Sequence, residues 1–133
     1  MKVNFDKPII EKECVLETVT GDLDNFYAAA SDIDRINLFF ILLASLHYYE
    51  EKGDTVRTAH LSFMTAYYVF VPLTPPGSEY LALYYMNKAV SLNPIPEYKE
   101  WLSIMRRRMS IWEISSSPCG KTRSPKSRRT GLR

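Results

Sequence analysis

Helix-breaking residues divide the middle of this chain into segments of similar length. Gly53, residues 72–77 and the pair Asn93 and Pro94 each end a helix, and apolar residues recur at helical spacing between them. The longest apolar runs fall short of the ~20 residues that a membrane helix needs. The sequence therefore predicts an all-α protein of antiparallel helical hairpins with no membrane span.

Five helices are expected, over residues 22–30, 32–52, 54–72, 78–92 and 96–114. Ser31 with Asp34 forms a capping-box-like pair, and Asp54 and Ser78 are the expected caps of the two helices that follow. The helix over residues 32–52 is apolar nearly all round its middle. Such a helix is expected to be covered on more than one side, as a central helix in a stack would be.

Three regions follow from this pattern and from the distribution of charge. Residues 1–20 form an irregular or short extended lead-in, residues 21–114 the helical domain, and residues 115–133 a disordered basic tail that has too little apolar surface to offset its ordering. Residues 1–112 hold eleven Lys and Arg against fourteen Asp and Glu, whereas residues 113–133 hold six against one. A mildly acidic body argues against nucleic acid as its main ligand.

No catalytic or metal-binding pattern is present in the sequence. Cys14 and Cys119 are isolated, His47 and His60 have no metal-ligand spacing, and no glycine-rich phosphate loop occurs. A lone histidine is more often a packing or surface residue than a catalytic base, so neither an enzyme nor a cofactor is expected. The absence of a secretory pattern at the N-terminus and the unpaired cysteines favour the cytoplasm.

Residues 59–94 resemble a tetratricopeptide repeat. Ala66, Tyr67 and Tyr68 are similar to the cluster late in the first helix of that repeat, and Ala82 and Ala89, followed by Asn93 and Pro94, to its second helix and terminating proline. The alanines allow two helices to approach closely, while tyrosines fill the wider gaps. The resemblance covers residues 32–112 and implies a short array of stacked helical hairpins that binds proteins in a concave groove.

The match departs from the family pattern in two places. About six extra residues lie between Tyr68 and Ala82, and Met64 stands where a small residue is usual. A second register is also open, in which Tyr48, Tyr49, Gly53 and Asp54, followed by Ala59 and Ala66, pair the second and third helices as the repeat. Packing between helices is the commoner role for such tyrosines.

Protein binding is the expected function, as an adaptor, a small chaperone or an assembly subunit. The resemblance implies that the first helix of each pair lines the groove, which makes Tyr49 and Tyr68 the candidate groove residues. Trp101 and Trp112 lie on one stripe of the fifth helix, and a chain with about two repeats is expected to self-associate through it.

The alternative function is contact with nucleic acid. Phosphate binding needs concentrated positive charge, which the fifth helix and the tail supply together. An address signal, an anionic membrane surface or a merely solubilising tail would fit the same residues. The candidate phosphate-binding residues are Arg106, Arg107, Arg108, Lys121, Arg123, Lys126, Arg128 and Arg129.

Overall fold

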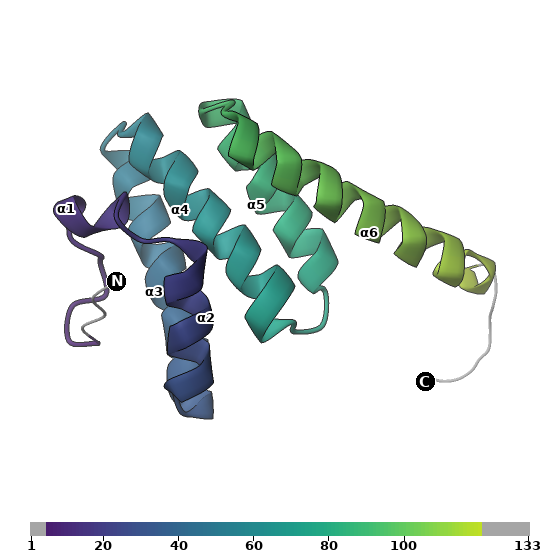
Figure 1. Ribbon diagram of the computed structural model, residues 1–133, viewed down its shortest axis with the longest axis horizontal. Coiled ribbons are helices and arrows are strands. Elements are labelled where there is room, and N and C mark those ends of the chain that lie inside the picture. Colours follow the sequence, from purple (N-terminus) through teal and green to yellow (C-terminus); the bar gives the residue numbers. More distant parts are fainter. Residues whose placement is uncertain (1–4, 121–133) are drawn as a thin grey trace.

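The structure, a computed structural model, describes residues 5–120, with side chains through Met109. It is all-α, as the sequence predicts, and the part described contains no strand (Figure 1). A short lead-in carries one helical turn, and five longer helices follow, with a π-helical segment after the third of them. The elements are α1 (Lys12–Val15), α2 (Thr20–Ala29), α3 (Asp32–Glu51), α4 (Thr55–Tyr68), η1 (Val69–Leu73), α5 (Ser78–Leu92) and α6 (Pro96–Gly120).

Two of the three expected caps are confirmed. Ser31 Oγ accepts the Asp34 N–H at 3.2 Å, and Asp54 Oδ1 accepts the Arg57 N–H at 3.2 Å. The expected cap at Ser78 is wrong, because Ser78 is the first residue of α5 and Gly77 precedes it with φ 82°. Glycine adopts this left-handed conformation without steric cost, so it turns the chain directly into the helix.

Pro72 explains the change of helix type at the end of α4. A proline has no N–H to donate, so it cannot continue the α-helical pattern. The chain widens into η1, and the Thr74 N–H bonds to the Val69 carbonyl, five residues back, at 3.1 Å. The expected stop at Pro72 is thus one residue short of the end of this wider turn.

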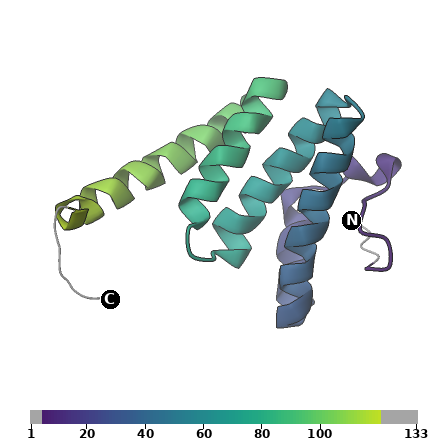
Figure 2. The same cartoon turned by 180° about the vertical axis from the view of Figure 1, so that it is seen from behind.

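α4 lies at the centre of the molecule and packs against both α3 and α5. Residues 61–69 are all buried. α3 and α5 lie behind α2, α4 and α6 in Figure 1 and in front of them in Figure 2. The helices therefore form two layers, with α2, α4 and α6 in one and α3 and α5 in the other.

Side chains on α4 join the elements of its own layer. The Tyr67 hydroxyl donates to both oxygens of Asp24 on α2, at 2.8 and 2.9 Å, and the Tyr67 ring packs edge-on against Trp101 of α6, with centroids 5.3 Å apart. Burial and the Asp24 carboxylate raise the pKa of Tyr67 to about 12, so the hydroxyl remains a donor. Tyr67 therefore contacts both α2 and α6, the two other helices of its layer.

The two ends of the chain differ from the expected boundaries. The lead-in contains the helical turn α1, and the described part of it has no extended strand pairing. α6 continues to Gly120, six residues beyond the expected end of the domain at Ile114. Residues 121–133 of the expected tail lie outside the described residues.

Candidate functional site

The outer face of α3 is the largest departure from the usual inside–outside pattern in this fold. Ile33, Ile36 and Phe40 are 71%, 52% and 60% exposed, respectively. Their spacing of i, i+3 and i+7 places them on one stripe of the helix. The half-buried Leu43 and Ala44 continue that stripe toward the C-terminal end. We call these five residues the α3 stripe.

The opposite face of α3 is also apolar, and it forms the core. Leu38, Leu42 and Leu46 are fully buried there, in the cluster that includes most of α4. The sequence predicts cover on more than one side of this helix, and in the structure only the core side is fully covered. The α3 stripe is therefore apolar surface that the described part of the chain leaves largely open.

The lead-in covers a different part of α3, near its C-terminal end. The Ile10 N–H donates to Ser45 Oγ at 2.9 Å, and the Tyr49 hydroxyl donates to the Ile10 carbonyl at 2.6 Å. Ile10 itself is buried. The two bonds on one residue hold the lead-in against α3 beside the buried face and leave the stripe open.

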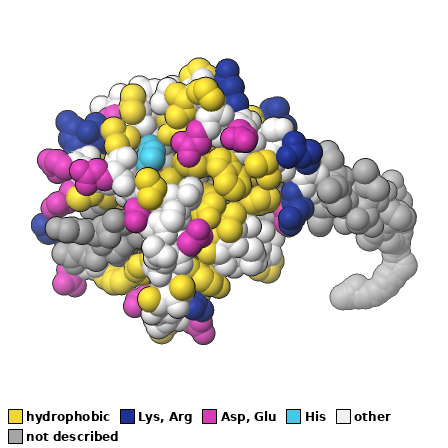
Figure 3. Space-filling view, viewed as in Figure 1, with side chains coloured by type: hydrophobic (Ala, Val, Ile, Leu, Met, Phe, Trp, Pro, Cys, Tyr) yellow, Lys and Arg dark blue, Asp and Glu magenta, His cyan; other side chains and the backbone are white. Residues whose placement is uncertain are grey.

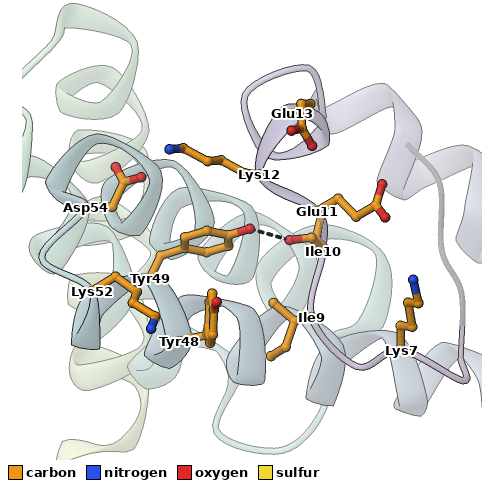
Figure 4. A pocket seen from close by; sticks show the side chains of 10 residues that line it. All are labelled: Lys7, Ile9, Ile10, Glu11, Lys12, Glu13, Tyr48, Tyr49, Lys52 and Asp54. Atoms are coloured by element: carbon orange, nitrogen blue, oxygen red, sulfur yellow. Dashed lines mark hydrogen bonds between the residues drawn. The ribbon is translucent and has the colours of Figure 1, made fainter.

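A shallow cleft of about 640 Å³ lies between the lead-in and the end of α3 (Figure 4). Basic and acidic side chains alternate around it, and the Tyr49 hydroxyl crosses it to the Ile10 carbonyl. The ammonium of Lys52 lies 5.3 Å from the centre of the Tyr48 ring. Because charges of both signs are interspersed, the cleft presents no concentrated charge to an ion. Its lining residues are Lys7, Ile9, Ile10, Glu11, Lys12, Glu13, Tyr48, Tyr49, Lys52 and Asp54.

His60 joins the lead-in to α4 and α6. Its Nε2 lies 2.7 Å from the Thr18 carbonyl, and its Nδ1 lies 3.3 Å from the Tyr98 hydroxyl. A neutral ring satisfies both contacts when Nε2–H donates to Thr18 and Nδ1 accepts from Tyr98. Burial lowers the pKa of His60, against the opposing effects of the Thr18 bond and of Glu97. These contacts give His60 a packing role between the lead-in, α4 and α6.

This lowered pKa predicts a loss of stability in mild acid. The unfolded chain takes up a proton at His60 near its ordinary value of 6.5, whereas the folded protein resists protonation until a lower pH. We therefore expect the free energy of unfolding to be maintained above pH 6.5 and to fall as the pH is lowered below it. Urea unfolding at pH 7.5 and pH 5.5 measures the difference.

Two substitutions separate His60 from the other groups that titrate in this range. H60Q should remove much of the pH dependence, because glutamine does not ionise. H47Q should retain it, since His47 is exposed on the outer side of α3. An unchanged pH dependence in H60Q would show that other groups cause it.

Tyr49 and Tyr68, the predicted groove residues, are both buried. Tyr49 borders the cleft, but its hydroxyl is bonded to Ile10, and the Tyr68 hydroxyl donates to the Arg35 carbonyl at 2.6 Å. Packing is therefore the role that the structure gives them. Tyr48 and Tyr84 are the exposed members of their doublets, and each packs edge-on against its neighbour.

Trp101 is half-buried against Tyr67, and the side chain of Trp112 lies outside the described part of α6. In the view of Figure 3, hydrophobic side chains gather between α4 and α6. Trp101 therefore has part of its ring in the core and part at the surface. Self-association through the tryptophan stripe stays a prediction.

The three arginines of α6 are exposed. Each has a local contact: Arg106 with Asn87 at 3.4 Å, Arg107 with Ser103 at 3.1 Å, and Arg108 over the Phe70 ring at 5.6 Å. They diverge along the helix toward different neighbours. The other predicted phosphate contacts lie outside the described residues: Lys121, Arg123, Lys126, Arg128 and Arg129.

Two further observations concern chemistry and membranes. No group of three or more His, Cys, Asp or Glu side chains that could hold a metal ion occurs within the described residues. In the same part of the chain, no helix is both long and apolar enough to cross a bilayer.

No family model, curated protein or solved structure matches the chain. The structure thus defines an all-α protein of packed helices.

Sequence reasoning did not single out Ile33, Ile36 and Phe40. The signal was present in the helix that is apolar nearly all round, because such a helix has one face more than its neighbours here can cover. Which face stays open depends on where the lead-in and α4 dock, and both contacts join residues far apart in the sequence.

Proposed function

We propose that this protein is a non-catalytic interaction module that binds a segment of another protein on the α3 stripe. The exposure of Ile33, Ile36 and Phe40 is the observation that supports this most strongly. Single apolar residues on a surface are ordinary, whereas a contiguous apolar patch commonly marks an interaction site. Burying each of these side chains fully is worth about 1.5–3 kcal/mol, so a partner that covers all three gains appreciably.

The all-α architecture and the sequence resemblance support the same class of function. Helical hairpins that resemble tetratricopeptide repeats imply a protein-binding array, and the two-layered packing around α4 is compatible with one. An adaptor, a small chaperone and an assembly subunit all bind a protein segment without chemistry. Each of these three roles requires the same open surface.

Substitutions on the α3 stripe should abolish partner capture. The variant I33Q/F40Q makes the stripe polar without adding charge, and glutamine is well accepted in helices. We expect affinity capture from cells that make this protein, after nuclease treatment, to recover a discrete partner with the unsubstituted protein and at least about tenfold less with the variant. Quantitative mass spectrometry of the captured fraction measures this ratio.

A matched control lies on α5. Tyr80 and Tyr84 are 64% and 54% exposed, so Y80Q/Y84Q removes a similar amount of exposed apolar surface from another helix. It should capture the partner as well as the unsubstituted protein. Equal capture by I33Q/F40Q would contradict the proposal, and recovery of nucleic acid alone without nuclease would favour the basic residues of α6 and the tail instead.

A further inference from the structure

We infer that the segment bound by the α3 stripe is an amphipathic α-helix of another protein, with Lys or Arg at both ends of its apolar face. This inference rests on the proposed function and specifies the chemistry of the partner. It is supported by the spacing of the stripe, by the charges at its two ends and by the repulsion that a second copy of this chain would meet.

The spacing of the stripe fits another helix. Ile33, Ile36, Phe40, Leu43 and Ala44 recur at intervals of three and four residues, which is the pattern of a seam between packed helices. At a rise of about 1.5 Å per residue, the stripe is about 16 Å long. About three turns of a partner helix would cover it, with its own apolar residues set between those of α3.

Acidic side chains lie at both ends of the stripe. Asp32 precedes Ile33 and its side chain is 94% exposed, even though Arg35 pairs with one of its oxygens at 3.1 Å. Glu51 follows Ala44 by one heptad, so it lies on the line of the stripe, and it is exposed. Glu50, beside Glu51, is paired with Lys88 of α5.

Arg35 and Lys52 mainly contact other groups, although Arg35 Nη1 also pairs with Asp32 at 3.1 Å. His47, which follows Ala44 along the stripe, lies 3.2 Å from Glu50. Arg35 donates from Nε to the Tyr27 carbonyl at 2.8 Å, and its guanidinium lies 4.1 Å from the centre of the Tyr27 ring. Lys52 lies over the Tyr48 ring, beside the cleft. The ends of the stripe therefore present negative charge, which attracts Lys or Arg on a partner.

A second copy of this chain fits the stripe poorly. If two α3 helices pair antiparallel about a two-fold axis, Asp32 of each lies near Glu51 of the other. If they pair parallel, each of these acids meets its own copy. Both arrangements place like charges together, so a partner of opposite charge is favoured over self-association through this face.

Synthetic helices test the inference directly. The first probe is a fluorescein-labelled peptide of about five turns with a Leu and Ala stripe and Lys at both ends of the stripe. A second carries Glu in place of each Lys, and a third keeps the composition of the first but scrambles the apolar positions. Fluorescence anisotropy with the full chain, at low and at moderate salt, gives each affinity.

We expect the Lys peptide to bind about 5- to 10-fold more tightly than the Glu peptide at low salt, and this preference to shrink as salt screens the charges. The scrambled peptide should not bind measurably. D32N/E51Q should reduce the preference for Lys over Glu while retaining binding. I33Q/F40Q, which has the same net charge as the unsubstituted protein, should bind neither peptide.

Four outcomes would overturn the inference. Equal affinity for the Lys and Glu peptides would remove the role of charge, and equal binding of the Lys peptide by I33Q/F40Q would show attraction that does not involve the stripe. A dimer in light scattering that I33Q/F40Q abolishes would make a second copy the occupant. If no peptide bound while partner capture still depended on Ile33 and Phe40, the proposed function would stand and the helical partner would be rejected.

Discussion

Replacing Tyr68 by alanine is expected to lower the free energy of unfolding by about 3–5 kcal/mol. Tyr68 is fully buried at the end of α4, where its ring packs edge-on against Tyr27 of α2 with centroids 6.4 Å apart. Its hydroxyl reaches the Arg35 carbonyl of α3. The truncated side chain would leave a cavity where α2, α3 and α4 meet. The cavity would not close, because other contacts hold the backbones of these helices in place.

Urea unfolding of Y68A and Y68F separates the packing of the ring from the hydrogen bond of its hydroxyl. Y68F keeps the ring and should cost only about 0.5–1.5 kcal/mol, since it removes one neutral hydrogen bond. Burial raises the pKa of Tyr68 to about 12, so the hydroxyl is protonated throughout such measurements at neutral pH. A loss below about 1 kcal/mol for Y68A would contradict the packing described for this part of the core.

Enlarging a buried alanine of α5 should also destabilise the protein. Ala82 of α5 is fully buried, and α5 packs closely along α4, whose Ala59 and Ala66 are fully buried too. We expect A82L to lower the free energy of unfolding by about 1–3 kcal/mol, because the added atoms must displace neighbours in a filled core. Thermal or urea unfolding measures the change.

The matched control for A82L is A28L on α2. Ala28 is exposed, so a leucine there meets solvent and should change the stability by no more than about 0.5 kcal/mol. Equal effects of the two substitutions would mean that α4 and α5 are not as close as the structure places them.

Local signals in the sequence were sufficient to predict the five longer helices and most of their ends. Ser31, Asp54 and the pair Asn93 and Pro94 act on backbone groups within a few residues, so their effects can be predicted without tertiary contacts. The prediction for Ser78 was wrong because a serine near the start of a helix resembles a cap in the sequence. In the structure Gly77 precedes the helix and makes the turn. The end of α6 had no comparable local signal.

The candidate site was harder to predict because it depends on contacts between distant segments. Adjacent tyrosines differ by about 100° around a helix, so one of Tyr48 and Tyr49 must face away from the core. Sequence spacing does not say which one does. The lead-in determines that Tyr49 is the buried one, because the Tyr49 hydroxyl bonds to Ile10. Which face of α3 stays exposed likewise depends on the segments that dock beside it.

The lead-in also has a consequence for the order of folding. Most helix contacts join consecutive elements, which form quickly because little chain must be closed. By contrast, the bond from Ile10 to Ser45 spans 35 residues and that from Arg57 to Lys12 spans 45. The lead-in leaves the ribosome before the later residues that receive it, so it should be among the last parts of this fold to dock.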